Sequence, residues 1–348
     1  MMKAAIFRSS GKLSVEEIDY PKLPDDGLII KVDACGICGS DLRTLRYGFR
    51  FNIDWQILGH EIAGTVFEVG SKVTNFCPGD RIAIAADVHC HNCYYCLRGL
   101  YNMCSNLQLI GTHFAGGFAE YMLLTKEILS RGVIHSIPSN VSSIHAALAE
   151  PASSVLNTQK NSCIGLSDIV LIIGAGPMGC LHAEIANIRG AFTIIADISK
   201  VRLNLARRFN LNHYINSSQS DLISEVMTIT NGLGADVVIV ACPSAEAQAQ
   251  AIQITRKQGR VILFGGLPKD DPITHLNANL IHYGEIMVVG AFSYHPSQHK
   301  VALDLISTGK IKAAYHITNT YPLSNIEEAM MVAMEGSSLK VVILPQEG

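Results

Sequence analysis

Four of the ten cysteines lie close together in the polar stretch HCHNCYYCLRGLYNMC, at Cys90, Cys93, Cys96 and Cys104. The spacing Cys-x2-Cys-x2-Cys-x7-Cys brings four soft thiolates within reach of one tetrahedral Zn²⁺ and leaves no position for water or substrate. A redox role for the Cys-x-x-Cys pairs is the weaker reading, because that motif belongs at the strand-to-helix junction of a βαβ unit and none is predicted here. The spacing therefore predicts a closed, structural zinc site. We expect the flanking His89 and His91 to be exposed loop residues rather than ligands.

A second set of metal-ligand residue types is dispersed along the chain. Cys38 lies in CGICGSD, His60 and Glu61 in LGHEIAG, and Glu150 in LAEPASS, each at a turn between predicted elements. One thiolate, one imidazole and one carboxylate would provide three ligands of a tetrahedral Zn²⁺ with an open fourth position for chemistry. Taken singly, each residue is also explained as a buried thiol, a core histidine or a helix-capping carboxylate.

The stretch IIGAGPMG has the G-x-G-x-x-G spacing directly after an apolar run and before a helical pattern. Backbone N–H groups of such a turn can approach a pyrophosphate at the start of the helix. The next apolar run ends in Asp197, where a carboxylate can bind both ribose hydroxyls and repel a 2′-phosphate. This favours NAD over NADP, although Lys200 and Arg202 nearby keep NADP open. The predicted cofactor-binding residues are Gly174, Gly176, Pro177, Met178, Gly179, Asp197 and Arg202.

The elements that must position these residues change in character along the chain. Up to about residue 150, short apolar stretches punctuated by Gly, Pro and Asp predict a β-rich part. From about residue 166, buried apolar runs alternate with helical patterns, which predicts βα units and a doubly wound parallel sheet. After about residue 290 the pattern becomes irregular. A chain of 348 residues is longer than one core usually supports, so two domains are expected.

Composition excludes several classes of function. Hydrophobic residues make up 48% and charged residues 16%, and the formal net charge is −3 with no long basic run. A nucleic-acid partner is not expected, because the positive patch that such a protein needs is absent. The start of the chain does not resemble a signal peptide and no run of about 18 apolar residues occurs, so we expect no membrane association and a cytoplasmic location.

A long motif gives these separate residues a common explanation. The run Gly59-His60-Glu61-x2-Gly64-x5-Gly70-x2-Val73 resembles the signature of zinc-containing medium-chain alcohol dehydrogenases, and GDRI, GGFAEY, the cysteine loop and the glycine-rich turn follow in that family's order. Within the family, Cys-Gly-Ser-Asp at 38–41 and Glu-Pro at 150–151 resemble the polyol branch, which includes sorbitol and galactitol-phosphate dehydrogenases. Threonine dehydrogenases are close neighbours.

The resemblance implies an α/β fold in which a GroES-like, β-rich catalytic domain (1–154 and 292–348) carries an inserted Rossmann domain (155–291). It implies two zinc ions per chain. The catalytic zinc would be held by Cys38, His60 and a carboxylate, which is Glu61, Glu150 or the two in exchange. The structural zinc would be held by the four-cysteine loop.

The resemblance also implies a reaction: oxidation of a secondary alcohol, a polyol or polyol phosphate, to a ketone, with hydride passing from a zinc-bound alkoxide to NAD. Ser40 would pass the alcohol proton outward. Arg43 stands where many members have the histidine that completes this proton relay. The route by which the proton is released is therefore not predicted. Arg43, with Arg46 or Arg50, is either surface charge or a receptor for a substrate phosphate.

Two alternatives and one expectation about assembly remain. A threonine 3-dehydrogenase-like activity and a non-catalytic zinc- and nucleotide-binding protein are the other functions considered. The stretch YGEIMVVGAFSYHP at 283–296 resembles the sheet edge through which family members pair, which implies a homodimer or homotetramer. The alcohol itself is not predicted, because residues such as Tyr47, Phe114 and Phe292 would shape the pocket and their positions do not follow from the sequence.

Overall fold

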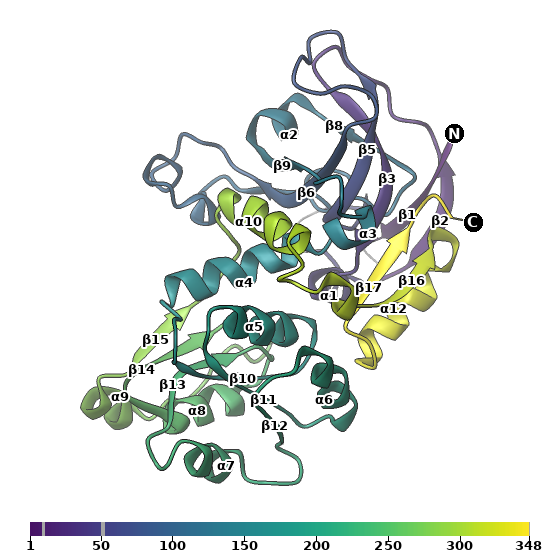
Figure 1. The fold of residues 1–348 in the computed structure, drawn as a ribbon. Helices are drawn as coiled ribbons and strands as arrows, with labels where there is room; N and C mark the ends of the chain where they lie inside the picture. Colours follow the sequence, from purple (N-terminus) through teal and green to yellow (C-terminus); the bar gives the residue numbers. More distant parts are fainter. Residues whose placement is uncertain (9–10, 50–52, 348) are drawn as a thin grey trace. The chain divides into compact units, whose positions relative to one another are not determined.

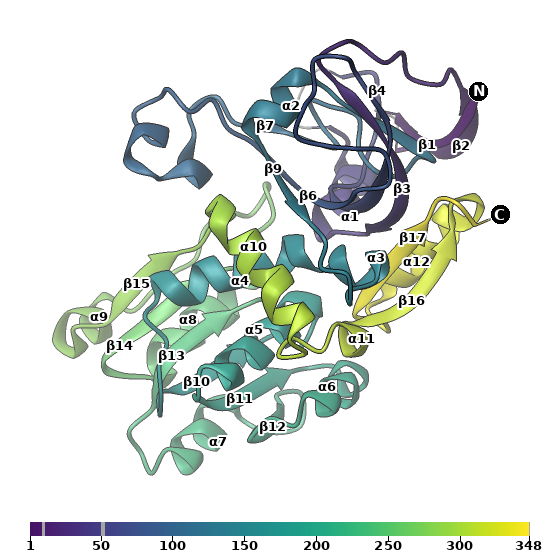
Figure 2. The same ribbon diagram turned by 45° about the horizontal axis from the view of Figure 1, so that its top comes forward.

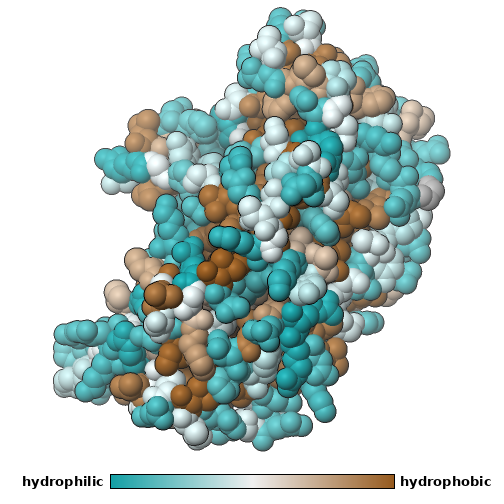
Figure 3. All heavy atoms as spheres, viewed as in Figure 1, coloured by the Kyte–Doolittle hydropathy of each residue, from teal (hydrophilic) through white to brown (hydrophobic). Residues whose placement is uncertain are grey.

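The computed structural model describes residues 1–8, 11–49 and 53–347. The chain forms two compact units (Figure 1). Unit 1 comprises Met1–Ser153 and Tyr294–Gly348, and unit 2 comprises Ser154–Ser293. No helix among the described residues has the length and apolar character that crossing a bilayer requires. Polar and apolar side chains are interspersed over the face seen in Figure 3, as is normal for a protein surface.

Unit 1 is built on β-strands, because its apolar residues alternate at the strand period or form short buried runs. One sheet has the order β16-β17-β3-β5-β6-β7, with β8 pairing β3 and β9 pairing β6, and a smaller sheet has the order β2-β1-β4. The strands are β1 (Met2–Arg8), β2 (Leu13–Ile18), β3 (Leu28–Gly36), β4 (Trp55–Ile57), β5 (Glu61–Val69), β6 (Arg81–Val88), β7 (Gln108–Leu109), β8 (Tyr121–Leu124), β9 (Gly132–Ser136), β16 (Ile317–Pro322) and β17 (Lys340–Leu344).

The core of unit 1 holds both ends of the chain together. Phe7 and Phe118 are fully buried in one apolar cluster with Ile343 of the last strand. β17 pairs antiparallel with β3, so Ile343 lies opposite Cys35. The end of the chain therefore lies beside the strand that leads to Cys38. The helices of this unit are α1 (Gly39–Tyr47), α2 (Lys126–Arg131), α3 (Ser143–Ala146), α10 (Pro296–Ser307), α11 (Ala313–His316) and α12 (Ile326–Glu335), with η4 (Leu323–Asn325).

These last elements correct one expectation. The pattern after about residue 290 was read as irregular, but the structure places helices and two strands there. The strands β16 and β17 are short and pair with each other and with β3, so the partners that stabilise them lie far away in the sequence. The β-rich part predicted up to about residue 150 is confirmed, because strands such as β3, β5, β6 and β8 lie there.

Unit 2 is a six-stranded sheet in the order β12-β11-β10-β13-β14-β15, with every pair parallel. The order reverses beside β10, which is the arrangement of a doubly wound sheet. Its strands are β10 (Ile169–Ile173), β11 (Phe192–Asp197), β12 (His213–Asn216), β13 (Ala235–Val240), β14 (Thr255–Leu263) and β15 (Met287–Gly290). Its helices are α5 (Pro177–Ile188), α6 (Lys200–Ala206), α7 (Leu222–Ile229), α8 (Ala245–Ile254) and α9 (Ala278–Gly284), with η3 (Arg207–Phe209). The unit boundary falls within α4 (Ala149–Asn161).

Both faces of this sheet are covered. Leu171 and Ile173 of β10 belong to one apolar cluster with residues of α7 and α8, while the alternate residues Val170 and Ile172 point to the opposite face and are also fully buried. This explains why β10 is a continuous apolar run rather than an alternating one. The glycine-rich turn follows β10 directly.

Candidate zinc and dinucleotide sites

The four-cysteine loop projects from the sheet of unit 1 and contains two short 3-10 turns, η1 (Cys96–Arg98) and η2 (Tyr101–Met103) (Figure 2). The sulfur atoms of Cys90, Cys93, Cys96 and Cys104 all lie within 4.8 Å of one another. Cys90 Sγ is 3.4 Å from Cys104 Sγ and 4.0 Å from Cys96 Sγ, too far for a disulfide. Four sulfurs bound to one zinc at about 2.3 Å would be about 3.8 Å apart, so the loop fits this ion.

Backbone groups of the loop favour thiolates. The N–H of Cys90 donates to Cys104 Sγ at 3.3 Å, and the N–H of Cys96 donates to Cys93 Sγ at 3.5 Å. Hydrogen bonds from the backbone N–H groups of Cys96 and Ser105 lower the pKa of Cys93 to about 5. Burial raises the pKa of Cys96 to about 12. A divalent cation is therefore what would let all four sulfurs ionise together.

His89 is not the exposed residue that was expected; it is 1% exposed, whereas His91 is exposed as expected. His89 directly follows β6, and its N–H donates to the carbonyl oxygen of Arg131 at 3.1 Å. Its ring lies 5.4 Å from that of Tyr101 at the base of the loop. The residue therefore packs at the end of β6 against the last residue of α2, and the exposed loop begins after it.

The dispersed residues meet at one end of the β3–β5 pair. Cys38 is the N-cap of α1, His60 precedes β5, and Glu61 is the first residue of β5. The sulfur of Cys38, a ring nitrogen of His60 and a carboxylate oxygen of Glu61 all lie within 4.8 Å of one another. These are one sulfur, one nitrogen and one oxygen donor, a set that suits zinc.

Asp41 belongs to this site and was not identified from the sequence. It is 3% exposed, and its carboxylate accepts a hydrogen bond from the Cys38 N–H at 2.9 Å and lies 3.6 Å from His60 Nδ1. Burial lowers the pKa of His60, but the Asp41 carboxylate and the Cys38 sulfur outweigh it and raise the pKa well above its ordinary value. A carboxylate beside Nδ1 fixes the ring so that Nε2 can face a metal. The available signal was the Cys-Gly-Ser-Asp spacing, which is that of a capping box.

The two carboxylate oxygens of Glu61 have different surroundings. Its Oε1 accepts a hydrogen bond from Lys340 Nζ at 2.7 Å, and the same ammonium donates to the carbonyl oxygen of Ile37 at 3.0 Å. Its Oε2 is buried and has no hydrogen-bond partner among the residues that the structure describes. A side chain at Gly36 would overlap this oxygen and displace the Glu61 carboxylate. A buried carboxylate oxygen with no partner, beside a thiol and an imidazole, is a fitting ligand atom for a cation.

The remaining predicted residues of this site lie at its margin. Glu150, in the first turn of α4, is buried but its carboxylate is not within the 4.8 Å cluster. Burial raises the pKa of Glu150 to about 7, opposed by His60 and reinforced by Glu61 and Asp87. Ser40 and Arg43 are exposed on α1. Arg46 is exposed as well, and Arg50 lies outside the described residues.

The glycine-rich turn of unit 2 has the predicted strand-turn-helix context. Gly174 follows β10 with φ +110°, Gly176 is the N-cap of α5, and Pro177 is its first residue, followed by Met178. A side chain at Gly179 would overlap the carbonyl oxygen of Gly174, so the helix can approach the turn only with glycine there. The helix start thus presents free backbone N–H groups, as a pyrophosphate site requires.

Asp197 at the end of β11 fixes this turn. Its Oδ2 accepts a hydrogen bond from the Ala175 N–H at 2.7 Å, and its Oδ1 accepts one from the Ser199 N–H at 2.7 Å. Arg202 Nη1 lies 4.0 Å from Oδ2. The structure therefore brings the predicted cofactor residues to the carboxyl ends of β10 and β11, where doubly wound sheets bind their ligands.

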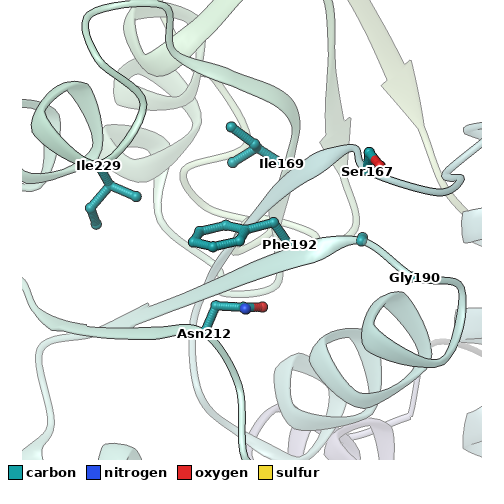
Figure 4. Close-up of a pocket in the computed structure, with 7 residues that line it drawn as sticks. Ser167, Ile169, Gly190, Phe192, Asn212 and Ile229 are labelled. Carbon is teal, nitrogen blue, oxygen red and sulfur yellow. The ribbon is translucent and has the colours of Figure 1, made fainter.

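A cavity of about 490 Å³ lies elsewhere in unit 2. Its lining includes Ile169 and Phe192, the first residues of β10 and β11, with Asn212 and Ile229 beside them (Figure 4). It is thus at the opposite end of the strands from the glycine-rich turn, and it is not the dinucleotide site.

Comparisons with known proteins agree with this architecture. Residues 24–136 match the alcohol dehydrogenase GroES-like domain and residues 177–308 match the zinc-binding dehydrogenase domain. The chain is 32% identical to a sorbitol dehydrogenase of Bacillus subtilis, covering 99% of this chain and 97% of the relative. It is 33% identical to a D-arabitol-phosphate dehydrogenase of Enterococcus avium, covering 94% and 92%. The crystal structure of a zinc-binding dehydrogenase of Sinorhizobium meliloti 1021 bound to NADP superposes with a TM-score of 0.89 at 31% identity, covering 99% of each chain.

The fold, the match to both domain families and these relatives define a class. The chain belongs to the zinc-containing medium-chain alcohol dehydrogenases, with its relatives in the polyol dehydrogenase-like branch, and it is an enzyme of the dehydrogenase class. The predicted α/β fold, a GroES-like domain with a Rossmann-type parallel sheet, is confirmed.

Proposed function

We propose that this enzyme oxidises a secondary alcohol of a polyol or polyol phosphate to a ketone, with NAD as hydride acceptor. The observation that carries the proposal is the convergence of Cys38, His60 and Glu61, with no partner for Glu61 Oε2 in the described part of the chain. The reaction is tested by following NAD⁺ reduction with a panel of polyols, polyol phosphates and threonine. An enzyme that holds zinc but reduces NAD⁺ with none of them would contradict it.

Each side chain of the site has a task in this reaction. A bound zinc ion at this set of donors would make the alcohol hydroxyl more acidic. Asp41 orients the His60 ring, and Lys340 holds one oxygen of Glu61 so that the other faces the donor cluster. Glu150, whose charge acts on His60, is the second carboxylate able to approach the metal. Ser40, exposed in the first turn of α1, passes the alcohol proton outward.

A second zinc ion in the four-cysteine loop would have a structural role. The sulfur spacing supports this, and four thiolates leave no position for substrate. We therefore expect about two zinc ions per chain by metal analysis. One ion, in the loop alone, would favour the non-catalytic alternative.

NAD rather than NADP is proposed as cofactor because Asp197 would repel a 2′-phosphate. Its backbone hydrogen bonds hold the carboxylate beside the turn while leaving lone pairs for ribose hydroxyls. Arg202 nearby and the NADP bound to the Sinorhizobium relative favour the other choice. The ratio of kcat/KM for NAD⁺ and NADP⁺ decides, and a ratio below one contradicts the proposal.

The relatives and α1 support the proposed substrate class. Arg43 and Arg46 are exposed on this helix and offer positive charge to a phosphate, as the name of the arabitol-phosphate relative would require. A threonine 3-dehydrogenase-like activity is the second candidate, and the same panel separates the two.

For assembly, we propose a homodimer or a homotetramer. Among the described residues, β15 is an edge strand of its sheet, and its Met287 and Val288 are exposed. An apolar edge strand is suited to pairing with a second copy. Light scattering at micromolar concentration tests this, and a monomer contradicts it. The ten free cysteines are consistent with a reducing compartment, so we propose a cytoplasmic location.

A further inference from the structure

Tyr294 carries a buried hydroxyl with no hydrogen bond among the described residues. The side chain is 2% exposed and packs with Ala85 and Val133. A phenol needs a partner when it is taken out of water, and buried hydroxyls in native proteins nearly always have one. The hydroxyl therefore either destabilises the core or donates a hydrogen bond to a side chain that moves when the proposed catalytic zinc binds.

Two buried carboxylates lie close enough to this hydroxyl to act on it electrostatically. Asp87 lies near the end of β6, next to Ala86, and Glu150 lies in the first turn of α4; both are buried. Burial raises the pKa of Tyr294 well above its ordinary value, and the charges of Asp87 and Glu150 reinforce the shift. Glu150 is also near enough for the hydroxyl to donate to it after a small adjustment. A phenol O–H beside a carboxylate acts as a donor to it.

The backbone holds Tyr294 in place. Ser293, the residue before it, has φ +50°, and its carbonyl oxygen accepts a hydrogen bond from Asn157 Nδ2 at 3.2 Å. Asn157 is on α4, two turns after Glu150. The helix that carries the carboxylate therefore also anchors the segment that carries the phenol. Such an arrangement suits a fixed donor rather than a side chain that fills space.

We propose that Tyr294 is a positioning residue: its hydroxyl donates to one carboxylate oxygen of Glu150 and directs the other toward the metal held by Cys38 and His60. This rests on the proposed zinc site. Outer hydrogen-bond partners of carboxylate and imidazole ligands orient them, and their loss costs about 10- to 100-fold in metal affinity or activity. Asp41 performs this task for His60, and Tyr294 performs it for Glu150.

The test compares Tyr294→Phe with the unchanged enzyme by competition for zinc with a chromogenic chelator. We expect the more weakly held of two zinc ions to bind about 10- to 100-fold less tightly, with the four-cysteine zinc retained as evidence that unit 1 is folded. The visible absorption of Co²⁺ at the catalytic site should change, and kcat should fall more than KM changes. Tyr20→Phe is the matched control, because the Tyr20 hydroxyl donates to the Glu68 carboxylate at 2.7 Å at the far end of β5.

A double-mutant cycle shows which carboxylate is involved. Tyr294→Phe should have little further effect on zinc affinity in a Glu150→Ala background and its full effect in an Asp87→Asn background. The proposal is overturned if Tyr294→Phe leaves zinc affinity and the Co²⁺ spectrum unchanged, or if its effect persists without Glu150. Failure of the proposed function would be distinct, because the unchanged enzyme would then bind no second zinc or reduce no NAD⁺.

Discussion

Lys340 Nζ lies 2.7 Å from Glu61 Oε1, and both side chains are buried. The ammonium is the last strand's contribution to a site otherwise formed by residues 38–61. A buried carboxylate next to a thiol and a second carboxylate would be costly without this positive charge. The pair therefore connects the stability of unit 1 to the ligand set of the proposed catalytic zinc.

Replacing Lys340 by Met should leave Glu61 buried without its cation. We expect the free energy of unfolding to fall by about 3–5 kcal/mol, as when one partner of a buried pair is removed. Urea denaturation measures this. Lys72→Met is the control, since the Lys72–Asp25 pair is exposed and should contribute no more than about 1 kcal/mol. Equal losses in the two variants would show that burial of the Lys340 pair is energetically unimportant.

Removing one thiol of the four-cysteine loop should remove one zinc ion. Cys96 is 4% exposed and belongs to the sulfur cluster, whereas Cys77 is an exposed free cysteine. Cys96→Ser should lower the zinc content from about two to about one per chain and lower the melting temperature, because metal binding contributes folding free energy. Cys77→Ser should change neither. Full zinc content in Cys96→Ser would refute the predicted ligand set.

Asp197→Ala should change the cofactor preference. Its carboxylate accepts two backbone hydrogen bonds and is proposed to bind the ribose, so we expect kcat/KM with NAD⁺ to fall about 10- to 100-fold. The ratio of NADP⁺ to NAD⁺ efficiency should rise because the repulsion of a 2′-phosphate is lost. Asp221→Ala is the control, as it removes a helix-capping carboxylate of the same unit that accepts from the Ser224 N–H. An unchanged ratio would remove Asp197 from the ribose site.

His182 should make the enzyme less stable in mild acid. It is fully buried, and burial lowers its pKa to about 3. In the unfolded chain the pKa of this histidine is near 6.5. Between pH 6.5 and pH 3 the unfolded state therefore binds a proton at His182 and the native state does not. Stability is therefore fully present above about pH 6.5 and is lost as the pH falls toward 3, by up to about 1.4 kcal/mol per pH unit.

Thermal melts between pH 8 and pH 5 test this. His182→Gln should show a shallower loss of melting temperature with falling pH than the unchanged enzyme, even if it is less stable at pH 8. His213, which is exposed on β12, provides the matched His→Gln control. Parallel curves for all three proteins would show that the buried imidazole does not set the acid response.

Features that depend on neighbours in the sequence were predictable. The cysteine spacing, the glycine-rich turn between β10 and α5, and Asp197 at the end of β11 are local patterns, and the structure places them as expected. The roles of Lys340 and Tyr294 were not predictable. Lys340 meets Glu61 across 279 residues, and a lysine or a tyrosine in an apolar strand pattern carries no sign of its partner.

The burial and the contacts of single side chains were harder to predict than the motifs that contain them. His89 was expected in solvent because it adjoins the cysteine loop, but it is buried directly after β6, where its N–H donates to the carbonyl oxygen of Arg131 at the end of α2. Asp41 could have been found as the fourth residue of Cys-Gly-Ser-Asp, since its carboxylate caps α1 through the Cys38 N–H. The spacing gives no sign that the same carboxylate also lies beside His60, the residue directly before β5.

Because Lys340 lies in the last strand, we expect the two proposed zinc sites to form at different times during synthesis. The cysteine loop is complete within residues 90–104, so it can capture an ion as soon as it leaves the ribosome. The pocket around Glu61 lacks its balancing cation until residue 340 has been added. Nascent chains stalled before that residue should therefore carry one zinc ion, and the second should be acquired only after β17 joins β3.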